Sequence, residues 1–496
     1  MAGGGAGSGA AFGAGSGAAF GAASDVNQPL VTLAVGAPVV TPELAFSLAE
    51  AHGGAPATFW DAPPPRGTRW AFVGWGEAAR AEAQGEGALA EVAAEASQIL
   101  ARVAPRRVRA GEVRAGETRE GEGEEALREA PADAPGPRLF GGVAFTPGAQ
   151  AAAEKAVAPP WEGFADASFV LPAWVYATDG ERAVLRVTVG AAEAAEAERA
   201  LAALVGVFAE ASVQERATLV PTAAAVTHEE LCAPGVFHEL VREALRAFAS
   251  GAMTKVVLAV PSLLTAEAPF EVGEALGRLG EGYPECARFA LPRGKAVFVG
   301  ASPERLVAVE GRALDVDALA GTMPRRGDDA EAARALLGSN KDRREHALVV
   351  DAIAQVLTPL CASLTVPEVP VVRTLRNVHH LWSPVRGVLV EKVSLLALAG
   401  RLHPTPAICG TPRPAALGWI RAREPAPRGW YAGAVGWLGE GGDGALWVGL
   451  RSALVEGTRA WLYAGVGLVA GSEPEMEFSE VRAKRRPMLA ALGGVA

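Results

Sequence analysis

The chain has 496 residues, 50% of them hydrophobic, and its 46 basic and 56 acidic residues give a formal net charge of −10. The acidic balance argues against general nucleic-acid binding, which needs a basic surface, and no apolar run reaches the ~18 residues of a membrane span. Its four cysteines form no CxxC pair, which is typical of reduced thiols in the cytoplasm. We therefore expect a cytoplasmic protein with a large apolar core and with neither a nucleic-acid nor a membrane partner.

Two segments of low complexity interrupt the amino-terminal part of the chain. Residues 1–28 are rich in Gly and Ala, and Gly5–Phe12 is repeated letter for letter at Gly13–Phe20. This segment lacks the basic and apolar regions of a signal peptide, so we expect a disordered tail. A second segment, at about 105–138, contains the sequence VRAGE twice and almost no apolar residues. We expect it to be a disordered insertion at the surface.

The elements between and after these segments predict an α+β protein. Residues 29–250 combine apolar strands with an Ala-rich helical stretch near Glu77–Arg102. Residues 251–496 mix strands such as Val256–Val260 with helices such as Arg343–Leu357, without the strict alternation of a doubly wound fold. We therefore expect a sandwich of large, mainly antiparallel sheets covered by helices, with a catalytic half at 251–496 that holds the chemical motifs.

Two acidic helical patterns stand out in this second half. Asp342 and Glu345 are three residues apart and therefore lie on one face of a helix. The same spacing joins Glu477 to Glu480. Like charges at this spacing repel unless a cation lies between them, and Mg²⁺ prefers carboxylate oxygens together with substrate. Each pair taken alone is more typical of a solvated acidic face, so the surrounding motifs decide between the two interpretations.

A lysine and a glutamate at strand ends suggest acid–base chemistry. Lys255 begins an apolar strand, where a lysine usually extends its ammonium group to water but, when desolvated, loses its proton and acts as a base. Glu304 follows the strand of the motif GASPERL, and it is either an ion-pair partner of Arg305 or of another surface base, or a general acid. For each residue both interpretations stay open on the segment alone.

Other motifs supply groups that suit a small anionic ligand. Gly321 in LAGT permits close approach of the backbone, and Arg451 suits bidentate recognition of a carboxylate. Gly465 and Gly467 have backbone N–H groups that can face an anion. The histidine pair that ends at His380 has no third ligand at zinc spacing, which argues against zinc. Together with the acid, the base and the carboxylate pairs, these motifs describe a site for a small dicarboxylate and a divalent metal.

The order and spacing of these motifs closely resembles the chorismate-binding enzyme family, which contains isochorismate, salicylate, anthranilate and aminodeoxychorismate synthases. Between about Thr254 and Leu489 the shared motifs are, in family order, KVVLA, GASPERL, LAGT, KDRREH, VHHL, LHPTPA, RGWYAG, RSA, YAGVG and SEPEMEFSEVRAK. The resemblance implies the fold of anthranilate synthase component I, chorismate as the substrate and Mg²⁺ as the cofactor.

The resemblance also implies the roles of the acid and the base. Lysine at the position of Lys255 marks family members that add water, whereas glutamine marks those that add ammonia, so we expect no glutamine amidotransferase subunit. Lys255 would activate the water that attacks C2 of chorismate, and Glu304 would protonate the departing C4 hydroxyl. One departure lies nearby: Val260 stands where the family usually has arginine. We expect this change to loosen a structural salt bridge and to leave Lys255 in place.

The remaining candidate residues follow from the same resemblance. Glu345 and Glu480 match the direct Mg²⁺ ligands, and Asp342 and Glu477 support them through water. The metal would anchor the ring carboxylate of the substrate. The substrate-binding positions are Gly321, Thr322, His380, Ala407, Tyr431, Arg451, Gly465, Gly467 and Lys484.

Two water-adding reactions stay open. Isochorismate synthase stops after the hydroxyl transfer, whereas salicylate synthase also expels pyruvate. The LHPTPA loop favours the first, because isochorismate synthases have a small residue at the position of Ala407 and salicylate-forming relatives tend to have a hydroxyl group there. We therefore expect an isomerase of the isochorismate synthase type, closest to the menaquinone branch, with salicylate synthase as the alternative. The pathway stays open, because menaquinone, siderophore and salicylate biosynthesis all consume isochorismate.

Overall fold

A computed structural model describes residues 28–54, 56–107, 128–148, 159, 161–214, 225–325, 329–376 and 378–494. Apart from residue 28, the predicted tail lies outside these ranges, and so does the middle of the predicted insertion, 108–127. Both flanks of that insertion are structured, which corrects the prediction for them. Val103–Arg107 form a strand, and Glu129 forms an antiparallel bridge with Val35. Backbone pairing therefore orders these polar flanks although they offer little apolar surface.

The larger of two sheets contains 13 strands within the described ranges. Neighbouring strands are antiparallel, except that β1 and β5 are parallel. In sheet order the strands are β10 (Val226–Glu230), β11 (Lys255–Ala266), β23 (Arg459–Val469), β22 (Ser452–Glu456), β13 (Ala296–Ser302), β12 (Ala287–Arg293), β2 (Thr58–Asp61), β3 (Ala71–Trp75), β8 (Trp174–Thr178), β9 (Ala183–Gly190), β1 (Leu30–Ala37) and β5 (Val103–Arg107). The short strand β19 (Gly410–Thr411) pairs with the start of β11.

The smaller sheet contains 10 strands in the same described ranges, and all of its pairings are antiparallel. In sheet order these are β16 (Cys361–Thr365), β18 (Val378–Leu389), β15 (Ala313–Pro324), β14 (Arg305–Glu310), β21 (Gly444–Val448), β20 (Ala434–Leu438), β6 (Leu139–Val143), β7 (Ala167–Leu171) and β4 (Ala79–Ala83). β17 (Val371–Thr374) pairs with β18.

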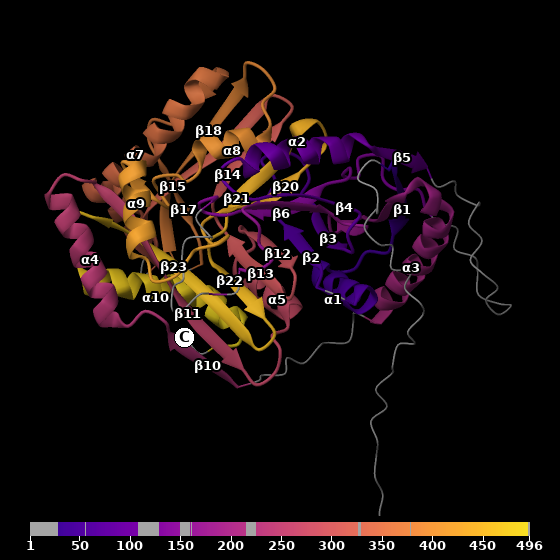
Figure 1. Cartoon of the computed structure of the whole chain (residues 1–496), viewed down its shortest axis with the longest axis horizontal. Coiled ribbons are helices and arrows are strands. Elements are labelled where there is room, and N and C mark those ends of the chain that lie inside the picture. Colours follow the sequence, from indigo (N-terminus) through magenta and orange to yellow (C-terminus); the bar gives the residue numbers. More distant parts are fainter. Residues whose placement is uncertain are drawn as a thin grey trace, which may run out of the picture.

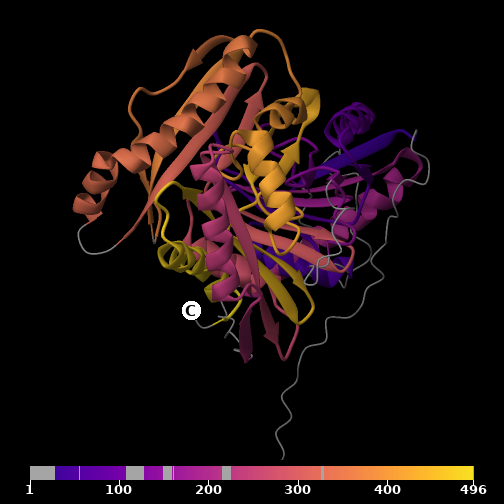
Figure 2. The ribbon, with the colours of Figure 1, turned by 60° about the vertical axis from the view of Figure 1, so that its left-hand side comes forward.

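Helices cover the outer parts of both sheets. They are α1 (Pro42–Gly53), α2 (Ala88–Ala101), α3 (Ala194–Gln214), α4 (Pro234–Ala249), α5 (Val272–Gly282), α6 (Asp329–Gly338), α7 (Asn340–Leu357), α8 (Leu395–Leu402), α9 (Arg413–Arg423) and α10 (Pro474–Ala491), with short 3₁₀ turns at Ala191–Glu193, Thr358–Leu360 and Glu440–Gly442. α7 lies along β15 and β18, and α10 packs on β23, α4 and α5 (Figure 2). Among the helices in the described ranges, none has the length and apolarity needed to cross a membrane.

The predicted strands and helices of the second half are confirmed. Val256–Val260 lies inside β11, and Arg343–Leu357 lies inside α7. The predicted helix near Glu77–Arg102 is wrong in its first part, because Ala79–Ala83 form strand β4 and the helix begins only at Ala88. Pairing with β7 outweighs the helix propensity of alanine in this stretch.

The two predicted halves of the chain share both sheets. β2 pairs with β12 in the larger sheet, and β6 pairs with β20 in the smaller one. Figure 1 shows this arrangement: purple β6 lies beside yellow β20, although most early elements lie on the right and the orange elements on the upper left. The carboxy-terminal half therefore extends sheets that the amino-terminal half also forms, and hydrogen bonds join the strands of both halves within each sheet.

Candidate active site

One cavity of about 180 Å³ brings the predicted site residues together from distant parts of the chain. Strands β11, β15, β18 and β23 and helices α7 and α10 all contribute to its wall. The predicted residues that line it are Glu304, Gly321, Thr322, Asp342, Glu345, His380, Ala407, Tyr431, Arg451, Gly465, Gly467, Glu477, Glu480 and Lys484. The sequence motifs thus converge on a single site, as expected.

Lys255 does not line the cavity itself but lies directly behind Glu345. Its side chain is 1% exposed, and its Nζ donates a hydrogen bond to Glu345 Oε1 at 2.7 Å. This burial excludes the interpretation in which the ammonium group extends to water. Burial also acts to raise the pKa of Glu345, but the charge and hydrogen bond of Lys255, together with Lys484 and Lys341, outweigh it and lower that pKa.

Glu304 is buried at the end of β13, in the turn that leads into β14. Its backbone N–H donates to Ser302 Oγ at 3.3 Å, and its carbonyl accepts from Val448 N at 2.9 Å. Burial, reinforced by the negative charge of Asp317, raises the pKa of Glu304 to about 8. A carboxyl group with this pKa keeps its proton at neutral pH, as a general acid must. The alternative ion pair with Arg305 does not form, because Arg305 pairs with Asp317 at 3.1 Å.

His380 is a neutral imidazole held between two polar side chains. Its Nε2 lies 3.3 Å from Arg451 Nη2, and its Nδ1 lies 3.0 Å from Thr322 Oγ1. Burial, together with the positive charge of Arg451, holds the pKa of His380 well below its usual range. Because the guanidinium can only donate, Nε2 accepts and Nδ1 carries the proton, which points toward Thr322 Oγ1. The three residues therefore form one fixed polar wall.

Two of the predicted glycines permit close approach of protein side chains in the cavity wall. Gly321 has a φ of +78°, and a Cβ there would lie 3.1 Å from the Cβ of Asp342 on α7. A Cβ at Gly467 would lie 3.2 Å from Lys255 Cε and 3.3 Å from Glu345 Oε1. A side chain at either position would push the charged groups away from their present places.

Another part of the cavity wall contains an aromatic pair and two residues in strained backbone conformations. The rings of Tyr431 and Tyr463 stack at 4.9 Å with an interplanar angle of 16°, and burial raises the pKa of Tyr431 to about 12. The Tyr431 hydroxyl therefore keeps its proton and is available as a donor. Ala432 and Arg451 have φ values of 55° and 48°, which non-glycine residues rarely adopt. Such strain is typical of functional sites, and no sequence signal predicted it.

The carboxylates of α10 are balanced by a lysine on the same helix. Glu480 Oε1 lies 2.7 Å from Lys484 Nζ, which also donates to the Gly465 carbonyl at 3.1 Å. Glu477 is 6% exposed, and burial together with the charge of Glu480 raises its pKa. Glu477 therefore holds its proton more tightly than a solvated glutamate, mainly because it is buried.

The predicted metal ligands have the right chemistry for Mg²⁺, since carboxylate oxygens from α7 and α10 line one cavity. Within the described ranges, no group of three or more His, Cys, Asp or Glu side chains is arranged as a metal site. Two direct carboxylates plus substrate oxygens would satisfy Mg²⁺ without such a group. The assignment of Glu345 and Glu480 as direct ligands, with Asp342 and Glu477 in support, stays a prediction.

A buried ion pair beneath the cavity was not predicted from the sequence. Arg428, which lines the cavity, donates to both carboxylate oxygens of Glu424, at 2.5 and 2.9 Å. It also donates to the carbonyls of Ile408 at 2.9 Å and Val257 at 2.8 Å. This guanidinium therefore ties the loop that carries Ala407 to strand β11. The i,i+4 spacing of the pair was the available signal, but it does not reveal burial.

The departure at position 260 is accommodated by another arginine. Val260 is completely buried, and its carbonyl accepts a hydrogen bond from Arg485 Nη2 at 2.9 Å. The buried Arg485, on α10, also forms an ion pair with Glu230. Arg485 of α10 thus links β11, through the Val260 carbonyl, to Glu230 of β10. The strand that begins with Lys255 is therefore held in place without an arginine at position 260.

Carboxylates, cationic groups and a tyrosine hydroxyl from distant parts of the chain surround one cavity, which is the chemistry of a binding site for a small acidic molecule. Residues 18–493 match the family model described as chorismate binding enzyme. The chain belongs to the chorismate-binding enzyme family, which confirms the resemblance seen in its motifs.

Two relatives illustrate the reactions found close to this chain. It is 40% identical over 370 residues to the salicylate biosynthesis isochorismate synthase of Pseudomonas aeruginosa. This alignment covers 72% of this chain and 75% of the relative. It is 33% identical over 378 residues to isochorismate synthase MenF of Bacillus subtilis, and this alignment covers 75% of this chain and 77% of the relative.

A solved structure supports the predicted fold. Anthranilate synthase component I from Streptococcus pneumoniae matches with a TM-score of 0.65 at 20% identity, covering 86% of this chain and 93% of that one. The expected fold, an anthranilate synthase component I-like sandwich of large antiparallel sheets with helices, is therefore confirmed.

Proposed function

We propose that this protein is a Mg²⁺-dependent isochorismate synthase that converts chorismate to isochorismate. The observation that supports this most is the buried Glu304, whose pKa of about 8 keeps it protonated in the same site as Lys255. A lysine base and a carboxylic acid are the pair that water addition with loss of a hydroxyl requires. The relatives named above carry isochorismate synthase in their names, which agrees with this pairing.

In the proposed reaction, Lys255 takes a proton from a water molecule as its oxygen attacks C2 of chorismate. The two ring double bonds shift, from C1–C2 and C5–C6 to C1–C6 and C4–C5, and the bond from C4 to its hydroxyl breaks. Glu304 gives its proton to the departing hydroxyl, which leaves as water. One water is consumed and one is released, so the overall reaction is an isomerisation. Glu304 then takes up a proton from solvent, and Lys255 releases its extra proton to solvent.

The remaining residues bind and orient the two carboxylates of the substrate. Tyr431 and Arg451 supply a hydroxyl donor and a guanidinium on one wall, and Lys484 supplies an ammonium group on another. Backbone N–H groups of Gly465 and Gly467 on β23 complete the set of donors. Charge-assisted hydrogen bonds of this kind fix the orientation of a small dicarboxylate.

Magnesium would be held by Glu345 and Glu480, with Asp342 and Glu477 supporting it through water. When bound, the ion supplies positive charge that anchors the ring carboxylate of the substrate. Lys255 and Lys484 pair with the two direct ligands in this structure, so the carboxylates already face the cavity with their charge balanced.

The test is incubation of the purified protein with chorismate, with and without Mg²⁺, followed by chromatographic separation of the products. We expect a magnesium-dependent mixture of chorismate and isochorismate without pyruvate. Salicylate together with pyruvate would instead assign the protein to the alternative, salicylate synthase. The apolar Ala407 in the cavity wall, which offers no hydroxyl, supports the first outcome. Absence of turnover would overturn both.

A further inference from the structure

Arg293, at the end of β12, is a buried cation outside the cavity. Its side chain is 3% exposed in total, and no carboxylate in the described part of the chain forms an ion pair with it. Burial, together with the charge of Arg80, lowers the pKa of Arg293 to about 9, while Glu82 and Glu77 act in the opposite direction. A buried guanidinium without a direct counter-ion is costly, so its hydrogen bonds indicate what it is for.

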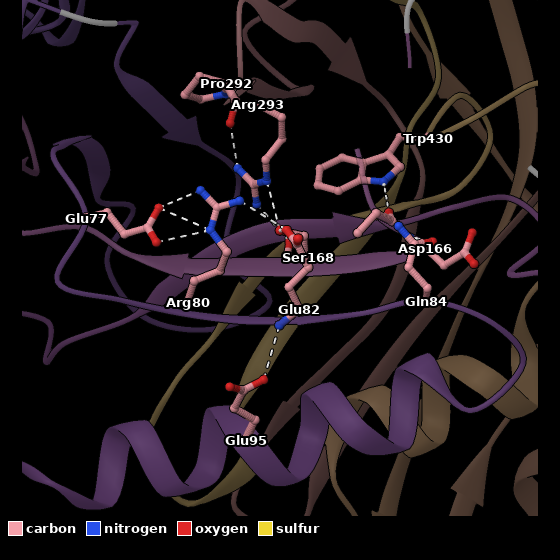
Figure 3. A network of polar contacts seen from close by, with 11 residues as sticks. Glu77, Arg80, Glu82, Gln84, Glu95, Asp166, Ser168, Pro292, Arg293 and Trp430 are labelled. Atoms are coloured by element: carbon pink, nitrogen blue, oxygen red, sulfur yellow. Dashed lines mark hydrogen bonds and ion pairs between the residues drawn. The ribbon is translucent and has the colours of Figure 1, made fainter. Parts of the chain in front are cut away.

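Ser168 connects Arg293 to a carboxylate. Arg293 Nε donates to Ser168 Oγ at 2.9 Å, and its Nη2 donates to the Ser168 carbonyl at 2.8 Å (Figure 3). Ser168 Oγ in turn donates to Glu82 Oε2 at 2.8 Å. One hydroxyl can accept from the arginine and donate to the glutamate at the same time. Glu82, which also forms an ion pair with Arg80 at 3.1 Å, therefore offsets part of the charge of Arg293 through Ser168.

The guanidinium carbon of Arg293, Cζ, lies over the ring of Trp430, 5.1 Å from the ring centroid. The indole N–H of Trp430 donates to the Ala165 carbonyl at 2.8 Å, and Phe164 meets the ring edge-on at 5.0 Å. Ala165 and Ser168 belong to the same segment, which leads into β7. Figure 3 shows Arg293 and Ser168 on one side of Trp430 and the Asp166 segment on the other. The ring is thus held by its face and by its N–H group.

The position of Trp430 is transmitted to the cavity because the loop around it has little freedom. Gly429, with a φ of +55°, has no room for a side chain, since a Cβ would lie 2.1 Å from the ring of Trp161. On the other side, Tyr431 and the strained Ala432 line the cavity. Because Trp430 and Tyr431 are consecutive residues in this constrained loop, we expect a displacement of the Trp430 ring to shift the Tyr431 hydroxyl.

We propose that Arg293 and Ser168 are positioning residues, which act through Trp430 to hold Tyr431 where it binds a substrate carboxylate. This inference rests on the proposed function for the identity of the substrate. It gives the amino-terminal half a specific role in recognition, because Ser168 comes from β7 and its partner Glu82 from β4.

The test compares steady-state kinetics of Ser168→Ala, Arg293→Lys and Arg293→Met with the wild-type enzyme. We expect Ser168→Ala to raise KM for chorismate about 10-fold, the size typical when a group that orients a binding residue is lost. The kcat should change little, since a lost binding contact affects ground state and transition state alike. Arg293→Lys should lie between the wild type and Arg293→Met, because it keeps the charge without the planar fork.

A double-mutant cycle separates positioning from general loss of structure. If Ser168 acts through Tyr431, Ser168→Ala should raise KM no further in a Tyr431→Phe background. Arg459→Met is the matched control: Arg459 also lies over a tryptophan, 4.9 Å from the ring of Trp461, but its side chain is 53% exposed. Its KM should equal that of the wild type.

Hydrogen exchange of the loop 428–433 gives a readout that does not need turnover. Ser168→Ala should speed exchange in this loop, and Arg459→Met should not. If the wild type converts chorismate but Ser168→Ala matches the control in both KM and loop exchange, the positioning role is overturned. Additive KM effects in the cycle would overturn it as well. If the wild type does not convert chorismate but loop exchange still responds, the proposed function fails and the positioning role stands.

Discussion

Two parts of the cavity wall are built in different ways: the helix end, formed by α7 and α10, and the loop end, formed around Tyr431 and Arg451. At the end formed by α7 and α10, charged side chains project from helices, and Glu480 is still 38% exposed beside Lys484. At the loop end, Tyr431 projects from the segment between α9 and β20, and Arg451 projects from the turn between β21 and β22. The Tyr431 ring stacks on Tyr463, and Arg451 hydrogen-bonds to His380. Two residues with positive φ, Ala432 and Arg451, occur at this loop end.

The difference indicates a division of labour between the two ends. The partly exposed ion pair between Glu480 and Lys484 on α10 can exchange partners when a cation arrives, at little cost to the fold. Strained loops fixed by buried contacts keep their geometry, which suits recognition of a substrate with a defined shape. We therefore expect substitutions at the helix end to alter metal dependence and substitutions at the loop end to alter stability and substrate affinity.

The largest effects should come from the acid and the base, which belong to neither end alone. Lys255→Ala and Glu304→Gln should each lower kcat by at least about 100-fold, the usual contribution of general acid–base catalysis. Circular dichroism should show an intact fold for both variants. Normal turnover in either variant would disprove the role assigned to that residue. The helix end and the loop end would then have no shown reaction to serve.

At the loop end, Arg428→Met should destabilise the protein. Removing one partner of a buried ion pair leaves the other charge uncompensated, at a cost of about 3–5 kcal/mol in the free energy of unfolding. Arg423→Met is the control, because Arg423 pairs with Glu243 at the surface, where such pairs contribute about 0–1 kcal/mol. Denaturant unfolding of both variants measures the difference, and equal losses would contradict a structural role for the buried pair.

At the helix end, Glu480→Gln should weaken the binding of magnesium while leaving the melting temperature close to that of the wild type. We expect the Mg²⁺ concentration for half-maximal activity to rise about 10- to 100-fold, as when a metal site loses part of its support. Glu475→Gln on the same helix is the control, since the Glu475 side chain is 85% exposed. A magnesium titration of Glu480→Gln that matches the wild type would remove this residue from the ligand set.

The pH dependence gives the smallest effect and concerns Glu304. Burial, with Asp317, raises its pKa to about 8, so kcat should fall about tenfold per unit above pH 8 as the acid loses its proton. Between 4.5, the ordinary value, and about 8 the folded chain keeps a proton that the unfolded chain has lost. The contribution of Glu304 to stability is therefore complete below pH 4.5 and is lost as the pH rises through 8.

Melting temperatures of the wild type and Glu304→Gln across this pH range measure that contribution. The amide has no ionised form, so its stability relative to the wild type should increase from pH 5 to pH 8. A constant difference between the two proteins would show that Glu304 titrates at its ordinary pKa.

Much of the helix end could be predicted from the sequence, because charged residues three or four positions apart on a helix reveal their common face directly. Asp342, Glu345, Glu477 and Glu480 were found in this way, and all four line the cavity. The roles of the acid, base and carboxylate-binding residues required the family resemblance, since a lone lysine or glutamate on a strand has several uses.

The loop end could be predicted only in part. Tyr431 and Arg451 were named from motifs, but the positive φ of Ala432 depends on contacts that no local pattern records. Glu424 and Arg428 are close in sequence, but the burial of their ion pair depends on long-range contacts such as that of Arg428 with β11. The bonds of Arg293 to Ser168 join β12 of the larger sheet to β7 of the smaller one, which no local pattern records. The helix predicted near residue 77 failed for the same reason, because pairing with β7 is a long-range property.

The shared sheets have a consequence for how the chain is made. While the protein is being synthesised, β2 and β6 leave the ribosome long before their partners β12 and β20. Until then each presents an open edge of unpaired N–H and carbonyl groups, which invites pairing with other chains. Truncated products that stop before β12 should therefore be prone to aggregation. Completion of the carboxy-terminal half supplies β12 and β20, which cover these strand edges.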